Sequence, residues 1–242
     1  METANKNIIS PDKYKRKPWF CAVKAFLRVV VKKPNFVYLG EKVRPGGIIL
    51  SNHEGPKCPV FLELYNEVPI RCWGAHEMNK NLKTAYKYQT EIYYHQKKHW
   101  NLLLARIGCL IITPVTYLYY KGIKLISSYG DMRFRKTLDE SIKTLKDGCS
   151  VVIFPEKSEN GYLKDLTGFH PGATMLFQFC QKHGLNPPVH VAYLQKETKN
   201  FVFDVPTTVN ELMDLGLSRT ELMQKLCDRC NELGRMSFPK TV

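Results

Sequence analysis

Two short segments of the chain carry the residue types that acid–base chemistry needs. His53 lies in SNHEGPKCP at 51–59, directly after the apolar run GGIIL, and Glu156 lies in PEKSENGY at 155–162, directly after VVIF. Apolar runs of this length are typical of buried strands, so both segments are predicted to be loops at strand ends. An imidazole and a carboxylate that meet there could take up and return a proton. We therefore predict catalytic roles for His53 and Glu156.

The elements that position these loops alternate between strand and helix. Two capping boxes, Thr208 with Glu211 and Ser218 with Glu221, predict carboxy-terminal helices within 207–235. The alternation indicates an α/β fold with a mostly parallel sheet flanked by helices, in which ligands bind beyond the carboxyl ends of the strands. A length of 242 residues fits a single domain over 1–242. The other predicted elements are strands at 36–39, 47–51, 69–74, 150–154, 189–194 and 201–205, and helices at 60–65, 76–99, 138–145 and 173–182.

The amino-terminal segment 11–33 is predicted to be a basic amphipathic helix. On a helical projection Trp19 and Phe26 share an apolar arc, while Lys24 and Arg28 stack on another. Such a helix can lie in a membrane interface with its cations toward anionic lipid, or it can dock on its own domain with a solvated basic face. The chain has 36 Lys and Arg against 22 Asp and Glu, and its formal net charge of +14 favours an anionic partner such as a membrane surface.

Other features of composition bear on the class of protein. The positive charge would also suit nucleic acid, but no RNA-binding sheet motif or recognition helix is found, so no nucleic-acid partner is expected. Eight cysteines without framework spacing and a polar start, METANKNIIS, indicate reduced thiols and a cytoplasmic protein. Cys227 and Cys230 form a single CxxC, which lacks the two further ligands of a structural zinc site. We therefore expect two helix cysteines and no metal.

The most apolar tract lies between Trp100 and Tyr120. Arg106 interrupts it, Pro114 lies near its middle, and only 14 uncharged residues separate Arg106 from Lys121. A helix that spans a bilayer needs about 20 apolar residues, so we predict a buried core segment or a surface-embedded one. The surrounding stretch 76–122 matches no motif that assigns it a role.

Four short motifs follow one another along the chain, each in the strand or loop context expected for it. They are Asn52 and His53, then Phe154, Pro155 and Glu156, then Phe169, Pro171, Gly172 and Ala173, and finally PPVHVAY at 187–193. A single such motif is weak, but four in sequence are fairly specific. Together they resemble the glycerolipid acyltransferases typified by 1-acylglycerol-3-phosphate acyltransferase, and the similarity runs from about residue 18 to residue 195.

The resemblance implies an O-acyltransferase. In that family the histidine takes a proton from the hydroxyl of a lysophospholipid, most directly 1-acylglycerol-3-phosphate, which attacks the thioester of acyl-CoA or acyl carrier protein. The reaction requires no metal or other cofactor, and the enzyme would be peripheral on the inner face of a membrane. The implied substrate-binding residues are Asn52, Cys58, Phe154, Pro155, Lys157, Ser158, Arg133 and Gly172.

The chain departs from the family pattern at three places. Cys58 stands where an aspartate orients the histidine, and a mostly protonated thiol cannot replace that charge. Glu54, Glu63 or Glu156 could serve instead. In FPEKSE, Lys157 and Ser158 replace a glycine and a threonine, and Glu159 replaces a phosphate-binding arginine. The intermediate motif of the family, which ends in Asp-Arg, is at best GIKLISS at 122–128 without those charges, and Arg133 or Arg135 just downstream could supply the lost cations. The alternative is a catalytically impaired acyltransferase-fold protein that binds lipid or a partner at the membrane surface.

Overall fold

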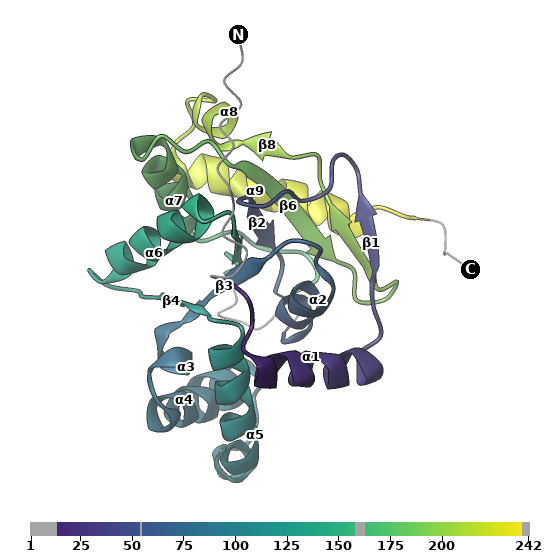
Figure 1. The fold of residues 1–242 in the computed structure, drawn as a ribbon, viewed down its shortest axis with the longest axis vertical. Coiled ribbons are helices and arrows are strands. Elements are labelled where there is room, and N and C mark those ends of the chain that lie inside the picture. Colours follow the sequence, from purple (N-terminus) through teal and green to yellow (C-terminus); the bar gives the residue numbers. More distant parts are fainter. Residues whose placement is uncertain (1–13, 54, 158–162, 239–242) are drawn as a thin grey trace.

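The computed structural model describes residues 14–53, 55–157 and 163–238, which form an α/β fold around one mixed sheet (Figure 1). Its eight strands follow the order β1-β7-β6-β2-β5-β3-β4, and β8 pairs with β6. The strands are β1 Asn35–Tyr38, β2 Ile48–Ser51, β3 Ile70–Ala75, β4 Ile126–Ser128, β5 Ser150–Ile153, β6 Pro188–Leu194, β7 Asn200–Phe203 and β8 Thr207–Thr208.

The centre of the sheet is parallel. β2 pairs in parallel with both β5 and β6, and β3 pairs in parallel with β5 and with β4. Antiparallel pairing occurs where β6 meets β7 and β8. The structure thus confirms the predicted α/β class with a mostly parallel sheet flanked by helices.

Helices cover both faces of the sheet. Alternate residues of each central strand point to opposite faces, so Ile48 and Leu50 pack with one helical layer and Ile49 packs with the other. The first layer comprises α6 Phe134–Lys146, α7 Gly172–Lys182, α8 Val209–Met213 and α9 Arg219–Arg235, and the second comprises α1 Pro18–Val30 and α2 Lys57–Tyr65. The two capping boxes predicted at Thr208 and Ser218 are confirmed as the starts of α8 and α9, and α9 contains both cysteines of the CxxC.

A helical segment between β3 and β4 extends beyond the edge of the sheet (Figure 1). It consists of α3 His76–Lys80, α4 Leu82–Tyr88, the π-helix η1 Gln89–Lys97 and α5 Leu102–Gly122. A π-helix of this length is unusual, and such turns occur frequently at functional sites. This segment is the stretch for which the sequence assigned no role.

Two sequence predictions need correction here. Of the helix predicted over 11–33, residues 11–13 lie outside the described part, and the helix itself begins only at Pro18 and ends at Val30. Of the two alternatives for the apolar tract around Pro114, the buried core segment is wrong: α5 runs through the proline as one helix of 21 residues, and only 17% of its apolar window is buried. The surface-embedded alternative stays a prediction. Within the described ranges, α5 is the one helix long and apolar enough to span a bilayer on length and composition.

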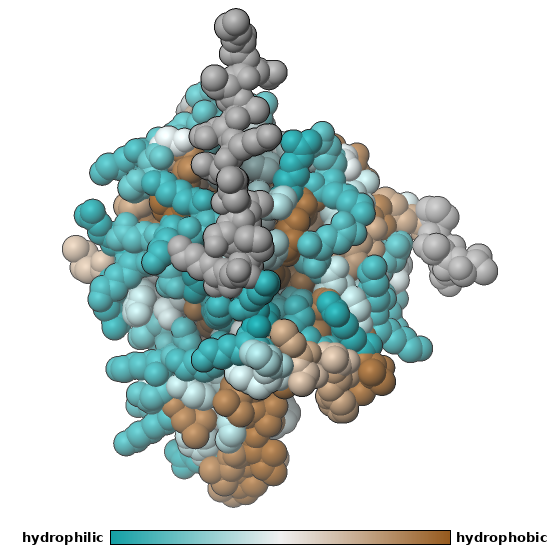
Figure 2. Space-filling view, viewed as in Figure 1, coloured by the Kyte–Doolittle hydropathy of each residue, from teal (hydrophilic) through white to brown (hydrophobic). Residues whose placement is uncertain are grey.

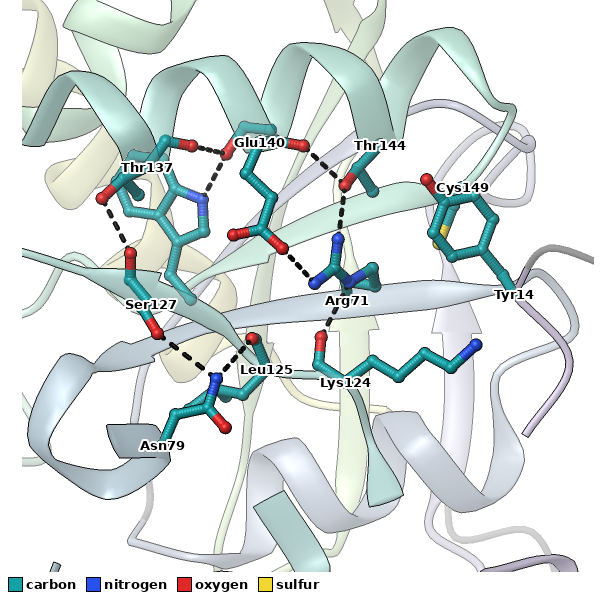
Figure 3. Close-up of polar contacts among 12 residues, drawn as sticks. Tyr14, Arg71, Asn79, Lys124, Leu125, Ser127, Thr137, Glu140, Thr144 and Cys149 are labelled. Carbon is teal, nitrogen blue, oxygen red and sulfur yellow. Dashed lines mark hydrogen bonds and ion pairs between the residues drawn. The ribbon is translucent and has the colours of Figure 1, made fainter. Parts of the chain in front are cut away.

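The edge of the sheet that carries this segment is fixed by a polar network (Figure 3). Arg71 of β3 donates to the Lys124 carbonyl at 2.7 Å, to Thr144 Oγ1 at 3.0 Å and to Glu140 Oε1 at 2.5 Å. Asn79 of α3 donates to the Leu125 carbonyl at 3.3 Å. These bonds tie β3, α6 and the start of β4 together, so the strand ends and the helical segment hold a defined geometry.

Candidate active site

A cavity of about 770 Å³ lies at the carboxyl ends of β2, β5 and β3, bounded on the other side by the helical segment. This is the edge at which parallel sheets place ligands. The cavity is lined mostly by apolar and aromatic side chains and falls within the usual size range of small-molecule sites. Of the residues predicted for the site, it brings together His53, Phe154, Pro155, Glu156 and Gly172.

The loop after β2 holds His53 at the cavity. Asn52 is buried and locks the end of β2 to the end of β6, because its Oδ1 accepts from the Leu194 N–H at 2.8 Å and its Nδ2 donates to the Leu194 carbonyl at 3.3 Å. The N–H of Gly55 donates to the His53 carbonyl at 2.7 Å, with Gly55 at a φ of +56°, a conformation that favours glycine. The turn thereby fixes the position of His53.

Glu156 joins the two strand-end loops. Its Oε2 accepts from the backbone N–H of His53 at 2.9 Å, and the rings of Phe154 and His53 lie with centroids 4.9 Å apart. The His170 N–H donates to the Pro155 carbonyl at 2.6 Å, which ties the loop after β5 to the start of α7. Glu156 therefore holds the histidine loop in place, and the predicted meeting of the two loops is seen in the structure.

Burial shapes the acid–base character of His53. Removal of the imidazole from water, together with the nearby positive charges of Lys97 and Lys98, lowers the pKa of His53 from 6.5 to about 4. The ring is consequently neutral at physiological pH, as a proton acceptor must be. A pKa of about 4 also makes it a weaker base than an ordinary histidine.

The helical segment supplies the opposite wall of the cavity. Tyr93 and Tyr94 of η1 and Tyr120 of α5 line it, together with Trp73 of β3. Burial raises the pKa of Tyr93 to about 12 and raises that of Tyr120 as well, so these phenols stay uncharged at neutral pH. These uncharged aromatic groups suit a long apolar ligand, and Glu77 of α3 and Lys97 of η1 line the same wall. The sequence signal was the aromatic cluster around 93–100, which no motif connected to the histidine loop.

Among the described residues that line the cavity, Lys97 supplies the single lysine or arginine side chain. It is the last residue of η1, is half-buried, and adds positive potential at the imidazole. The cavity thus combines an apolar body with one cation near His53. Sequence reasoning missed this residue because it looked for the cation downstream, at Arg133.

Gly172 lies where α7 begins, close to an aromatic pair. A Cβ at this position would lie 3.2 Å from Cζ of Phe134, whose ring meets Trp73 edge-on at 5.6 Å between centroids. The absence of a side chain at Gly172 therefore leaves room for these rings at the cavity wall. His170, just before this helix, also lines the cavity.

Of the remaining predicted substrate-binding residues, those that the structure describes do not line the cavity. Cys58 is fully buried in α2, with its Sγ 3.9 Å from Asn52 Oδ1, and acts as a packing residue behind the loop. Arg133 is on the surface, paired with Asp131 at 2.6 Å and placed over the Tyr129 ring. Lys157 is exposed, with its N–H bonded to the Gly168 carbonyl at 3.0 Å. Ser158 lies outside the described residues.

Of the three carboxylates considered as partners of His53, the structure describes Glu63 and Glu156, which lie in different surroundings. Glu63 is buried between α1 and α2, where it accepts from Arg16 Nη2 at 2.6 Å and from Lys24 Nζ at 2.9 Å. It is therefore committed to docking α1. Glu54 lies outside the described residues. Glu156 is thus the carboxylate whose described contacts reach the histidine loop.

No protein-family model matches the chain, and a comparison with curated proteins finds no significant match.

Proposed function

We propose that the chain is an O-acyltransferase that moves a fatty acyl group from acyl-CoA or acyl carrier protein to the hydroxyl of a lysophospholipid, with 1-acylglycerol-3-phosphate or a related molecule as acceptor. The observation that carries the proposal is the meeting of His53 and Glu156 at an apolar cavity of about 770 Å³ beyond the strand ends. The motif order in the sequence is the second support.

The chemistry would use His53 as a general base. Its neutral imidazole accepts the proton of the acceptor hydroxyl while the oxygen attacks the thioester carbonyl. The tetrahedral intermediate collapses with cleavage of the C–S bond, and the imidazolium returns the proton to the departing thiolate. Glu156 is a positioning residue through its bond to the His53 backbone, and its negative charge favours the transient imidazolium.

Different parts of the cavity wall would bind the apolar and the charged parts of the substrates. Uncharged aromatic groups, among them Trp73, Tyr93 and Tyr120, would contact an acyl chain. Lys97 would attract the anionic head group of the acceptor, a role that the resemblance gives to an arginine at the position of Glu159. The enzyme would act as a cytoplasmic protein, peripheral on the inner face of a membrane, with the surplus of positive charge drawn to anionic lipid.

A second candidate is a catalytically impaired protein that uses the same cavity to bind lipid or a partner. Two observations favour it: a buried thiol at Cys58 replaces the aspartate of the family pattern, and the lowered pKa of His53 weakens it as a base. Loss of the orienting aspartate in a serine protease triad lowers turnover by roughly 10⁴.

The decisive experiment is an acyl-transfer assay of the purified protein with acyl-CoA and lysophosphatidic acid. We expect His53→Ala to lower the rate by about 10²–10⁴. His183→Ala, at the exposed end of α7 and outside the cavity lining, is the matched control and should retain the rate. Activity that survives His53→Ala would contradict the proposal.

The role of Glu156 can be separated from that of His53. Glu156→Gln keeps an oxygen to accept from the His53 N–H but removes the charge, whereas Glu156→Ala removes both. Retention of activity in the glutamine variant would assign Glu156 to loop positioning, and equal loss in both variants would assign a role to its charge. If the wild type is inactive and Cys58→Asp creates activity, the second candidate is favoured.

A further inference from the structure

Helix α1 faces the opposite way from an ordinary docked amphipathic helix. Its apolar residues point outward in a continuous helical stripe, and their side chains are between 36% and 84% exposed. We call this the α1 stripe: Trp19, Val23, Phe26, Val29 and Val30.

The cations of α1 point toward the protein instead. Arg16, just before the helix, and Lys24 both bond to the buried Glu63, and Arg28 donates to the Leu64 carbonyl at 3.0 and 2.7 Å. Phe20 is fully buried next to Gly122 at the end of α5. The helix is thus anchored by one aromatic ring and three cations, while the apolar side chains on its other side stay at least 36% exposed in the described chain.

A second outward stripe runs along α5. Each of its side chains is more than half exposed, and together they occupy one side of the helix at three- and four-residue spacing. We call this the α5 stripe: Leu103, Leu104, Ile107, Leu110, Ile111, Val115 and Leu118. Figure 2 shows the apolar surface gathered over the lower part of the molecule, where Figure 1 draws α1 and α5.

The opposite side of α5 is packed along its length. Ala105, Cys109 and Thr113 are buried, and Thr113 Oγ1 donates to Gln89 Oε1 of η1 at 3.0 Å. Further along the helix, Thr116 and Tyr120 line the His53 cavity. One side of α5 packs against the protein, so lipid could contact only the other side, which carries the α5 stripe.

We propose that the α1 and α5 stripes together insert into one leaflet of an anionic bilayer, with α5 forming the wall between that leaflet and the cavity. Charge selects this occupant over a second copy of the chain. Residues 14–33 contain seven Lys or Arg and no Asp or Glu, and Lys17, Lys32 and Lys33 are exposed at the two ends of α1. Two copies would bring these cations together, whereas anionic lipid neutralises them.

This inference goes beyond acyl transfer, because it concerns a surface outside the cavity and would hold for a protein without catalytic activity. Its geometry differs from the amino-terminal helix expected from the sequence, since apolar side chains, and not the cations of Lys24 and Arg28, face the membrane. Interfacial helices of this type embed their apolar face about 5–10 Å into the boundary between head groups and acyl chains.

Binding to vesicles of phosphatidylcholine with phosphatidylglycerol tests the proposal. Phe26→Glu with Val29→Glu, and separately Leu110→Glu with Ile111→Glu, should each lower partitioning by roughly tenfold or more. The matched control, Met132→Glu with Leu215→Glu, changes exposed apolar side chains outside the stripes and should bind like the wild type. Circular dichroism and urea denaturation check that every variant is folded.

The native tryptophans report on insertion directly. Trp19 belongs to the α1 stripe and Trp100 lies just before α5, and both are exposed, whereas Trp73 lines the cavity and bonds to Ser141. Phospholipids with brominated acyl chains should quench the wild-type fluorescence, and Trp19→Phe with Trp100→Phe should remove most of the quenching. Unchanged vesicle binding in both stripe variants would overturn the proposal. So would a lipid-free dimer that the stripe variants dissociate, since it would make a second copy the occupant.

Discussion

α9 and α1 are both amphipathic helices packed on the same domain, yet they face in opposite directions. α9 buries Leu222, Leu226 and Leu233 against the sheet and exposes polar residues such as Lys225 and Asp228. α1 buries a single aromatic ring and turns Phe26 and Val29 outward. The difference shows that an apolar stripe in a sequence identifies an amphipathic helix without specifying which medium its apolar face will meet.

The direction of α1 is decided by one buried anion on another helix. Glu63 of α2 forms ion pairs with both Arg16 and Lys24. These three charges can be removed from water because each cation is paired with the Glu63 carboxylate. α9 also pairs Arg229 with Asp204 at 2.7 Å, but that pair is more exposed than the pairs of Glu63, and the helix in addition buries a row of apolar residues. The comparison therefore predicts that α1 depends mainly on charge pairing and α9 mainly on hydrophobic burial.

The sharpest test of that contrast is Glu63→Gln. The change leaves Arg16 and Lys24, which are 10% and 20% exposed, without their counter-charge. We expect the free energy of unfolding, measured by urea denaturation, to fall by about 3–5 kcal/mol. Glu67→Gln is the control, because the Lys42–Glu67 pair is exposed and should contribute no more than about 1 kcal/mol. Similar losses in the two variants would contradict a charge-dependent α1.

Burial of His53, at the end of β2, makes the free energy of unfolding depend on pH. Its pKa is about 4 in the folded chain and 6.5 when unfolded, so the unfolded state binds more protons between these values. Stability is therefore full above pH 6.5 and declines as the pH falls toward 4, by about 2 kcal/mol between pH 7 and pH 5. Urea denaturation of the wild type and of His53→Ala at both pH values measures this contribution. Between pH 7 and pH 5 the free energy of unfolding of His53→Ala should fall by about 2 kcal/mol less than that of the wild type.

The same pKa bears on catalysis. A base with a pKa of about 4 is already unprotonated at pH 5, so the proposed acyl transfer should keep its rate there. An acidic limb of kcat/KM near pH 6.5 would instead indicate that His53 is solvated in the working enzyme.

The junction between the outward helices can be probed with one substitution at two positions of α5. Gly122→Ala places a methyl group in the ring of Phe20 and should destabilise the protein by about 1–3 kcal/mol. Gly108→Ala meets only ordinary contacts, with Trp100 at 3.6 Å, and should stabilise the helix by about 0.5–1 kcal/mol. Thermal unfolding should show a lower Tm than the wild type for Gly122→Ala and a higher Tm for Gly108→Ala. A stabilising Gly122→Ala would mean that α1 does not pack against α5 as described.

The sequence predicted the sheet side of the molecule well and the outward side poorly. The strands around Ile49 and Val152 were found because parallel strands buried on both faces appear as continuous apolar runs, and the two capping boxes were found because they are local. Their loops then pointed to His53 and Glu156. The facing of α1 depends on contacts 39 and 47 residues away in sequence, from Lys24 and Arg16 to Glu63, which no local pattern encodes.

The cavity wall escaped prediction for a related reason. Tyr93 and Lys97 reach the cavity from a π-helix, whose spacing differs from the 3.6-residue period used to assign faces. Pro114 counted against a spanning helix in the sequence, yet α5 runs through it as one helix. A proline removes one backbone donor, and a helix packed on a neighbour along its length can continue past that loss.

Helix starts give the smallest and most local test of the contrast. Ser218 caps α9, with its Oγ accepting from the Glu221 N–H, whereas Lys17 at the same position of α1 makes no side-chain cap bond. Ser218→Ala should therefore cost about 1 kcal/mol, and Lys17→Ser should add up to about 1 kcal/mol. Urea denaturation of the two variants measures both changes. If Lys17→Ser gains stability but weakens binding to anionic vesicles, the lysine is kept at an unfavourable cap position for its charge. Lys17 would then serve membrane binding by α1 at a cost in helix stability, because a serine at that position would cap the helix better.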